Sequence, residues 1–566
     1  MSAYVIGLDF GTNSCRSLVV DCANGRELAT HVFPYVSGVA GVILDNSDPN
    51  LARQNPADYI PGIQISIIEA LRKAGDTVAT FSPDRVIGIG VDTTGSSPMP
   101  VDQAGNPLCF NEGLKENPAA LVWLWKDHTS YAEAAHITNI AARMRSHYLE
   151  KVGGVYSSEW FWSKILHCKN EAPDVFDAAY SWVEVCDWIP ALLTGKMDPR
   201  RMKRSICAAG HKAMFSKEWG GLPDKEFLEA LSPGLGSLRD RLYSRGHTAD
   251  EEVGTLSREW AGKLGLRENV AVAVGAIDAH MGAVGAGIET GTLVKILGTS
   301  TCDIMIQPTD KPLADIPGVC GIVNGSVKKG YFGIEAGQSA VGDIFLWFVN
   351  ALVPEKYGST TEEKFKNLQH AASPLIPGES GLLALDWNNG NRTVLVDVRL
   401  TGVLLGQTLH TQAHEIYRAL VEATAFGALR IIDRIEEYGV PVRQIVNCGG
   451  LASRNPMLMQ IYADVTGRPM KISRSEQTPA LGAAMFGAVA AGKESGGFST
   501  IEEAQRAMAG IDKTFTPNPK NHRIYRSLYA LYCQLHDAFG TKDWNGSMHN
   551  VMKDLLVLRD SVRKKQ

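Results

Sequence analysis

Residues 4–21 read YVIGLDFGTNSCRSLVVD, and their pattern predicts how the chain begins to fold. Residues 4–8 form a short apolar run with β-branched side chains, which predicts a buried strand. A polar turn follows, and residues 17–20 predict a second strand. After an Asn-Gly turn, residues 27–33 can return as a third strand. The segment therefore predicts an antiparallel meander with a Gly-Thr-x-Ser turn at its first tip.

A similar unit recurs about half a chain later. Residues 292–297 predict a strand, Gly298-Thr299-Ser300-Thr301 is the turn, and residues 302–306 predict the returning strand. Repetition of this unit favours two duplicated domains, with a coincidence between two glycine turns as the alternative. A chain of 566 residues is also too long for one core. We place the boundary near residue 268, which gives domains 1–268 and 269–566.

The remaining pattern is that of an α/β protein. Three more apolar runs predict buried strands that end in an aspartate or in glycines: residues 86–91 before Asp92, 269–274 before Asp278, and 445–447 before Gly449-Gly450. Residues 413–438 have helical periodicity and end before Gly439 and Pro441. Open α/β sheets bind their ligands where strands end in such loops. These loops are therefore the candidate ligand sites.

Composition excludes several classes of protein. The chain is 45% hydrophobic and 21% charged with a formal net charge of −5, so neither nucleic acid nor an anionic membrane is an expected partner. Ten cysteines lack metal-ligand spacing and fit a reducing compartment. No signal-peptide pattern opens the chain, and the apolar stretch 479–492 is shorter than the ~18 residues of a membrane span. We expect a cytoplasmic protein.

The two hairpin tips carry the first chemical indication. Common nucleotide motifs such as the P-loop are absent from the sequence. Glycine at a hairpin tip lets backbone N–H groups approach phosphate oxygens, and Thr and Ser hydroxyls add donors. Two tips that face each other across a cleft could hold a triphosphate. Asp9 precedes the first tip, and a carboxylate there implies Mg²⁺, held partly through water.

These residues resemble a known family. Asp9-Phe10-Gly11-Thr12-x-Ser14, the turn at 298–301 and Gly449-Gly450 with Asn455 are similar to the actin/Hsp70/sugar-kinase ATPase superfamily. Within it the chain resembles the FGGY carbohydrate kinases: residues 402–406 and 415–422 resemble one family signature, which departs from the usual pattern at Gln407. The resemblance implies two duplicated actin-like (ribonuclease H-like) domains with a cleft between them.

Within that family the resemblance is closest to the ribulokinase group, and it runs from residue 5 to about residue 490. The segments that carry it are 90–96 (GVDTTGS), 124–128 (LWKDH), 157–160 (SSEW), 186–188 (CDW), 209–212 (AGHK), 278–284 (DAHMGAV) and 335–339 (EAGQS). The resemblance implies transfer of the γ-phosphoryl group of MgATP to the terminal (5-) hydroxyl of L-ribulose, in L-arabinose catabolism.

Phosphoryl transfer to a sugar needs a base near the accepting hydroxyl and a metal that neutralises charge. Asp278 ends a predicted buried strand beside glycines, and the resemblance implies that it is the general base, with Asp9 organising the metal. A helix cap is the alternative role for Asp278. His280 is an alternative base, or a packing residue.

Two further sets of residues follow from the resemblance. The substrate-binding set is Asp92, Gly95, Ser96, Trp125, Lys126, Lys212, Asp278, Glu335 and Gln338, in which Gly95 leaves room for the sugar and Lys212 offers a cation. The ATP-binding set is Gly11, Thr12, Ser14, Gly298, Thr299, Ser300, Gly449, Gly450 and Asn455. In this set Asn455 is expected near the adenine. Trp125 and Lys126 line the sugar pocket or only shape it.

Other functions stay open at this stage. A kinase for another ketopentose or polyol, such as D-ribulose, D-xylulose or ribitol, would share the ATP motifs. A noncatalytic ATP- or sugar-binding regulator and an actin-like mechanical ATPase belong to different classes, and the retained Asp9 and Asp278 disfavour the regulator. A homodimer rests on analogy alone. Residues 523–536 predict an amphipathic helix, and no motif is recognisable after about residue 515.

Overall fold

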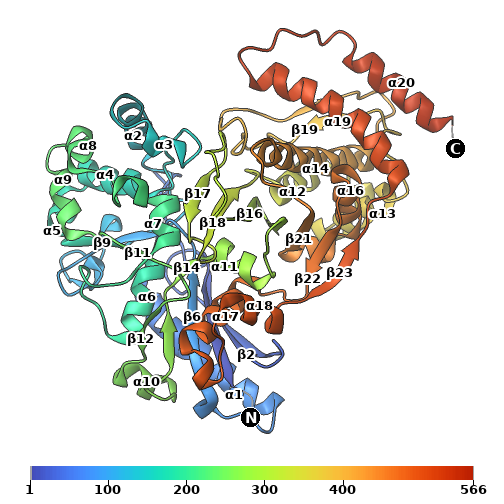
Figure 1. Ribbon diagram of the computed structural model, residues 1–566. Helices are drawn as coiled ribbons and strands as arrows, with labels where there is room; N and C mark the ends of the chain where they lie inside the picture. Colours follow the sequence, from blue (N-terminus) through green and yellow to red (C-terminus); the bar gives the residue numbers. More distant parts are fainter. Residues whose placement is uncertain (1–2, 565–566) are drawn as a thin grey trace.

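The computed structural model describes residues 3–564 and is built around two β-sheets (Figure 1). The strands of the first sheet are β1 (Tyr4–Phe10), β2 (Ser14–Asp21), β3 (Glu27–Pro34), β6 (Val86–Thr93), β12 (Glu252–Thr255), β13 (Ala271–Ala273) and β14 (Ala276–Ile277). Their order is β12-β13-β6-β1-β2-β3, with β14 also paired to β6. The predicted meander is confirmed, because β1, β2 and β3 pair antiparallel in sequence.

The second sheet repeats this arrangement. Its strands, in spatial order, are β17 (Gly321–Asn324), β18 (Tyr331–Ala336), β16 (Thr301–Pro308), β15 (Thr292–Leu297), β21 (Gln444–Cys448), β22 (Met470–Ser473) and β23 (Ile511–Phe515). In both sheets the first strand has an antiparallel neighbour on one side and a parallel neighbour on the other: β2 and β6 beside β1, and β16 and β21 beside β15. The predicted duplication and the α/β fold class are confirmed.

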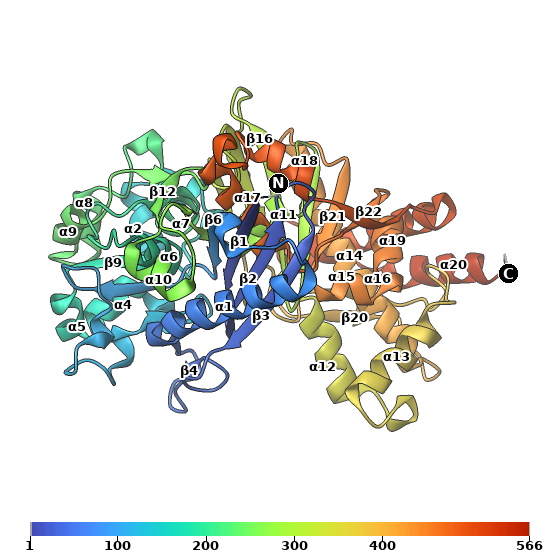
Figure 2. The same ribbon diagram turned by 90° about the horizontal axis from the view of Figure 1, so that it is seen from below.

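Two helices join the sheets. α11 (Asp278–Gly285) follows the first sheet, and α17 (Thr478–Ala491) lies beside β6 and α11 although it comes late in the chain (Figures 1 and 2). A Cβ atom at Gly90 would lie 1.7 Å from the carbonyl oxygen of Ala483, and one at Gly482 would lie 1.9 Å from that of Met281. The halves therefore pack backbone against backbone, which only glycine permits at these positions. β13 and β14 extend the first sheet beyond residue 268.

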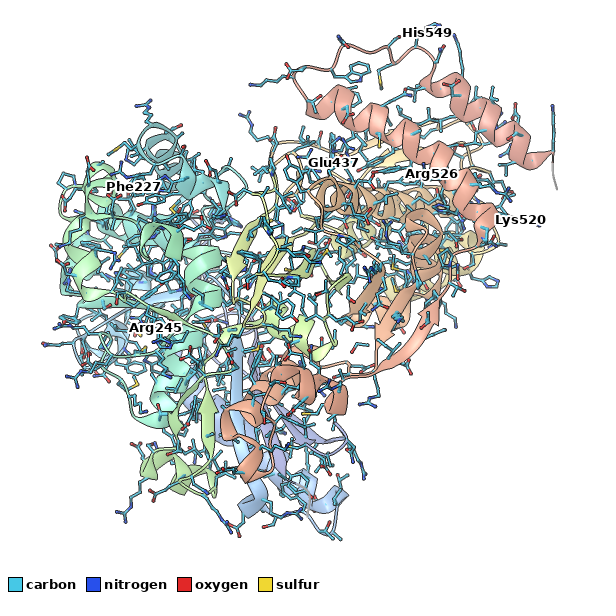
Figure 3. The ribbon with its side chains drawn as sticks, viewed as in Figure 1. Phe227, Arg245, Glu437, Lys520, Arg526 and His549 are labelled. Carbon is cyan, nitrogen blue, oxygen red and sulfur yellow. The ribbon has the colours of Figure 1, made fainter. Side chains whose placement is uncertain are left out.

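A helical subdomain lies between β6 and β12 in the sequence and occupies the left side of Figure 1. It contains β7 (Pro98–Val101), α2 (Tyr131–Met144), α3 (His147–Glu150), α4 (Phe161–Glu171), α5 (Pro173–Ala178), β9 (Ser181–Glu184), α6 (Val185–Thr194), α7 (Ile206–Lys212), α8 (Lys225–Leu231) and α9 (Leu235–Leu238). Its core includes the buried Trp123, Trp162 and Trp182. Figure 3 labels Phe227 in this subdomain. α7 packs against β17, so the subdomain reaches the second sheet.

Helices cover the outer faces of both sheets. α1 (Tyr59–Thr77) packs on the first sheet; α14 (Ala413–Glu437), α16 (Pro456–Thr466) and α19 (Pro519–Gly540) pack together beside the second. The predictions of α14 and α19 are confirmed. Sequence reasoning missed α20 (Val551–Arg563), which follows α19 at the C-terminal end; Figure 3 labels Lys520 and Arg526 on α19 and His549 before α20.

The remaining elements are short or peripheral. They are β4 (Ile43–Leu44), β5 (Ala52–Gln54), β8 (Val122–Trp123), β10 (Arg204–Ser205), β11 (Gly246–His247), α10 (Arg258–Leu264), α12 (Gly342–Leu352), α13 (Thr361–Ala372), β19 (Leu383–Leu385), β20 (Val403–Leu405), α15 (Gly450–Arg454) and α18 (Ile501–Met508). Across residues 3–564, none of the helices has both the length and the apolar character required to cross a membrane.

Candidate active site between the two sheets

The first hairpin tip, between β1 and β2, is stabilised by hydrogen bonds within the turn and from two neighbouring side chains. The amide of Gly11 donates to the carbonyl of Ser14 at 2.9 Å, which closes the turn. Nε2 of Gln54 donates to the carbonyl of Thr12 at 2.7 Å, and Nε1 of Trp125 donates to its hydroxyl at 3.0 Å. The sequence predicted Trp125 as a pocket residue, and the structure places it on this tip. Gln54 was missed, because a single polar residue in a short strand carries no recognisable signal.

The second tip, between β15 and β16, is exposed at Gly298 and Thr299. The amides of Val341 and Gly342 at the start of α12 donate to the carbonyls of Thr299 and Gly298 at 2.9 and 3.1 Å. These bonds fix the carbonyls on one side of the tip. A buried ion pair between Lys295 and Asp303, 2.7 Å apart, links the two strands that carry it. The tip is therefore exposed at its end and supported by α12 on one side.

The glycine pair after β21 lies beside β15. Gly449 has a φ of +93°, and a Cβ atom there would lie 2.5 Å from the carbonyl oxygen of Leu297. Only glycine satisfies both conditions. Asn455 is buried: its Oδ1 caps α16 by accepting from Leu458 at 3.0 Å, and its Nδ2 donates to the Tyr417 hydroxyl. Its amide group therefore supports α16, and its predicted place near the adenine stays a prediction.

Two carboxylates lie side by side at the end of the first sheet. Asp9 and Asp92 are register partners on β1 and β6, and Asp9 also pairs with Arg16 at 3.1 Å. Asp92 is fully buried, and neither of its oxygens has a hydrogen-bond partner among residues 3–564. Burial, then the charges of Asp9 and Asp278, raise the pKa of Asp92 well above its usual range. A divalent cation beside Asp9 would satisfy these oxygens, so the donor set fits Mg²⁺. Asp92 lies beside Asp9 on the neighbouring strand, and its predicted contact with the sugar stays a prediction.

Asp278 begins α11 and is half-buried. Its carboxylate accepts from the amide of Ala279 at 2.6 Å, and Ile277 occupies the cap position, so Asp278 is not the helix cap. Burial, followed by the negative charge of Asp9, raises the pKa of Asp278 to about 7. A carboxylate with such a pKa can accept a proton near neutral pH.

Lys212 and Glu335 meet between the domains. Lys212, at the end of α7, donates to the two oxygens of Glu335 on β18 at 3.0 and 3.2 Å, and both side chains are buried. Burial opposes the charge of Lys212, but Glu335 raises its pKa above the ordinary value. Burial opposes the charge of Glu335, but Lys212 and the neighbouring His211 and His280 lower its pKa. The pair therefore presents a cation and a carboxylate beside α11.

The two histidines beside this pair have pKa values below the ordinary range of an imidazole. Burial, and then the neighbouring His280, lower the pKa of His211 well below its usual range. Burial lowers the pKa of His280 to about 4, although Glu335 acts in the opposite direction. His211 was not predicted as a site residue, and His280 was only an alternative base.

The loop at 94–97 packs against the start of α11 and the helical subdomain. A Cβ atom at Gly95 would lie 2.7 Å from the Ile277 side chain, so glycine lets the loop pack beside the start of α11. The Ser96 hydroxyl donates to the carboxylate of Glu184, and Lys164 donates to the Ser96 carbonyl at 2.7 Å. Ser96 is therefore a buried anchor. Lys164 and Glu184 were missed; their signal was a charged residue within an apolar run.

The side chain of Gln338 forms hydrogen bonds inside the second domain. Its Nε2 donates to Asp386 at 2.7 Å and to the carbonyl of Thr424 at 2.9 Å, inside the second domain. Both donors of this amide group are therefore used within the second domain, and its predicted contact with the sugar stays a prediction. Lys126 is half-buried next to Trp125. The structure brings together Asp9, Asp92, Asp278, Lys212 and Glu335, and leaves Gln338, Asn455 and Ser96 as supports.

Comparison with known proteins identifies the family. The model of the N-terminal domain of the FGGY family of carbohydrate kinases matches residues 4–285, and that of its C-terminal domain matches residues 293–491. The chain belongs to the FGGY family of carbohydrate kinases. Ribulokinase from Geobacillus thermodenitrificans (strain NG80-2) is 44% identical over 574 residues, covering 99% of this chain and 98% of the relative. Ribulokinase from Mycolicibacterium smegmatis is 40% identical, and the match covers 100% of this chain and 98% of the relative.

Solved structures of other kinases share the fold. The xylulose kinase from Rhodospirillum rubrum has a TM-score of 0.76 at 22% identity, over 95% of this chain and 99% of that one. The Plasmodium falciparum glycerol kinase with ADP has a TM-score of 0.74 at 14% identity, and the match covers 94% of this chain and 98% of that one. The predicted two-domain fold of sugar kinases is confirmed, and the protein is a carbohydrate kinase.

Proposed function

We propose that this FGGY kinase transfers the γ-phosphoryl group of ATP to the terminal (5-) hydroxyl of L-ribulose, giving L-ribulose 5-phosphate in L-arabinose catabolism in the cytoplasm. The observation that carries the proposal is the convergence of Asp278 with Lys212 and Glu335 from the two domains. Similarity to ribulokinases over the whole chain supports ribulose as the sugar.

The sugar is held at the Lys212–Glu335 pair. The ammonium group donates to a carbonyl or hydroxyl oxygen of the open-chain ketose, and the carboxylate accepts from neighbouring hydroxyls. Because the two side chains already hold each other at 3.0 Å, each is oriented before the sugar arrives. Trp125 and Lys126 complete one wall beside the first hairpin tip.

ATP is held at the two hairpin tips and the glycine pair. Backbone N–H groups and hydroxyls at Gly11, Thr12 and Ser14 and at Gly298, Thr299 and Ser300 receive the phosphates, and Gly449 and Gly450 admit the nucleoside close to the backbone. Asp9 and Asp92 would hold Mg²⁺. When bound, the ion neutralises charge on the phosphates.

Asp278 removes the proton from the attacking hydroxyl. The side chain lies near enough to Asp9, Lys212 and Glu335 for the charges of all three to act on its pKa. The new O–P bond forms as the bond to ADP breaks, and the carboxylate keeps the proton until the product leaves.

Two alternative functions remain open. A kinase for D-ribulose, D-xylulose or ribitol would use the same tips and the same base. A noncatalytic regulator would bind ATP or sugar without turnover, and the intact set of Asp9, Asp92 and Asp278 disfavours it.

A coupled assay of ADP release tests the proposal. MgATP is supplied with L-ribulose, D-ribulose, L- and D-xylulose, ribitol and glycerol in turn. We expect L-ribulose to give the highest kcat/KM. A higher value with another sugar would overturn the substrate assignment and leave the kinase assignment intact. No sugar-dependent ADP release would favour the regulator.

A further inference from the structure

Three buried side chains beside the sugar pocket form a second donor cluster. Nδ1 of His211 lies 3.4 Å from Oε2 of Glu335, and Nε2 of His280 lies 3.7 Å from the same oxygen. One ligand atom from each of the three residues lies within 4.8 Å of the others, and all three residues are buried. This cluster joins α7, α11 and β18, so it spans both domains.

The hydrogen bonds around His211 leave a lone pair on Nδ1. The Ser326 hydroxyl donates to the carbonyl of Val323 at 3.2 Å, so the 3.0 Å contact between Ser326 and Nε2 of His211 places the ring proton on Nε2. Nδ1 then faces the Glu335 carboxylate as one acceptor facing another. Nδ1 of His211 and both ring nitrogens of His280 are buried without a hydrogen-bond partner among residues 3–564.

A shared cation resolves this arrangement. Ligand atoms around tetrahedral Zn²⁺, with bonds of about 2.0–2.1 Å, lie roughly 3.3–3.4 Å apart. The two contacts to Oε2 are close to that spacing, and imidazole ligands with one carboxylate suit Zn²⁺ or Co²⁺ better than Mg²⁺. Ser326 fixes the orientation of His211 in the way that partners of metal-bound histidines do.

We propose that His211, His280 and Glu335 form a binding site for a transition-metal ion of the Zn²⁺ class, distinct from the Mg²⁺ position at Asp9, and that the bound ion inhibits the kinase. Glu335 would serve either the metal or the sugar, so the ion competes with the sugar. The inhibitory part rests on the proposed function; metal binding does not.

Lys212 competes with a metal ion for the carboxylate of Glu335. Its ammonium group already bonds both oxygens of Glu335 at 3.0 and 3.2 Å, so it opposes the approach of a second cation and occupies part of the carboxylate. Lys212→Met should therefore bind metal more tightly than the wild type. A cluster that only packs the interior would give no such increase.

Binding is measured on the tag-free, metal-stripped protein with Co²⁺ and Zn²⁺ alone. Calorimetry should show one tight site per chain, and Co²⁺ should give the visible absorption of a four-coordinate N/O site. His280→Ala should abolish the tight site, and Ser326→Ala should weaken it about 10- to 100-fold. His410→Ala, which removes an exposed histidine, is the control and should leave it unchanged. Circular dichroism confirms that each variant is folded.

Steady-state kinetics test the inhibition with Mg²⁺ in excess. Zn²⁺ should raise the KM for L-ribulose and leave kcat unchanged, and His211→Ala should lose this sensitivity. Tight binding without competition would overturn the inhibitory role alone. A tight site that survives His280→Ala, absence of any tight site in the folded wild type, or weaker binding by Lys212→Met would overturn the metal site.

Discussion

The contacts of their polar atoms divide the predicted site residues of this kinase into two groups: residues that support the fold and residues that are free to bind a ligand. Gln338 and Asn455 have polar side chains whose donors and acceptors are used within the second domain, so they hold the protein together. Asp92 has buried oxygens without partners, and Asp278 retains one oxygen beyond its short contact with Ala279. Unused hydrogen-bonding capacity in a buried group is costly, so such groups are the best candidates for function.

The base assignment predicts the behaviour of an isosteric variant. Asp278→Asn keeps the shape and an acceptor for Ala279 but cannot take a proton. We expect kcat to fall ~10²-fold or more, the scale of a general base, while L-ribulose still binds. ADP release and calorimetric sugar binding check this, with the exposed Asp310→Asn as control. Near-normal turnover would remove Asp278 from the mechanism.

The pKa of Asp278 predicts the pH dependence of activity. Burial and then Asp9 raise it to about 7, and only the deprotonated carboxylate can accept the hydroxyl proton. Activity should therefore be lost as the pH falls below about 7 and should reach a plateau above it. The measurement is kcat/KM for the sugar across pH at saturating MgATP. A profile flat down to pH 5 would contradict the role, and the residual activity of Asp278→Asn should lack this inflection.

At the scale of elements, close contacts of α17 with α11 and with β6 join the two halves of the molecule. Three glycines of α17 and β6 face backbone atoms across the contact, at Gly90, Gly482 and Gly487. The sequence marked residues 479–492 only as an apolar stretch and did not predict their partners, because a helix without an amphipathic pattern does not indicate which face meets which element.

Adding one methyl group to this contact tests its tightness. A Cβ at Gly482 would lie 1.9 Å from the Met281 carbonyl oxygen, so Gly482→Ala must separate the helices and should lower stability by about 1–3 kcal/mol. Gly75→Ala is the matched control, since that helical glycine in α1 has nothing within 4 Å of its Cβ position. It should stabilise the protein by roughly 0.5–1 kcal/mol. Thermal unfolding measures the stability of both variants. Equal changes in stability for Gly482→Ala and Gly75→Ala would contradict the close packing.

At the scale of the whole molecule, the proposed active site lies at an interface between different parts of the chain. Lys212 comes from the helical subdomain, Glu335 from the second sheet and Asp278 from the helix between the sheets. We propose that the domains divide between α11 and β15, and not near residue 268, because β13 and β14 extend the first sheet. This division agrees with the gap between the two family matches, residues 4–285 and 293–491.

The buried pair between the domains predicts a specific pattern of stabilities. Lys212→Met leaves the Glu335 carboxylate buried without its cation and should cost about 3–5 kcal/mol. The double variant Lys212→Met, Glu335→Leu should recover most of that loss, although it stays inactive. Lys263→Met, which breaks an exposed pair with Glu259, should cost less than ~1 kcal/mol. Denaturant unfolding measures all three; a double variant as unstable as the single one would refute the interpretation.

Local patterns were enough to predict the two hairpins, their duplication, α14, α19 and the strand ends at Asp92 and Asp278, because strand alternation, turn residues and helical periodicity are properties of neighbouring residues. Resemblance to a family added Lys212 and Glu335. The orientation of Ser96, Gln338 and Asn455, the helical subdomain around Trp162 and the meeting of His211 with His280 depended on the folded chain. Their contacts join residues far apart in sequence, such as Ser96 with Glu184 and His211 with Ser326, and no local pattern specifies such partners.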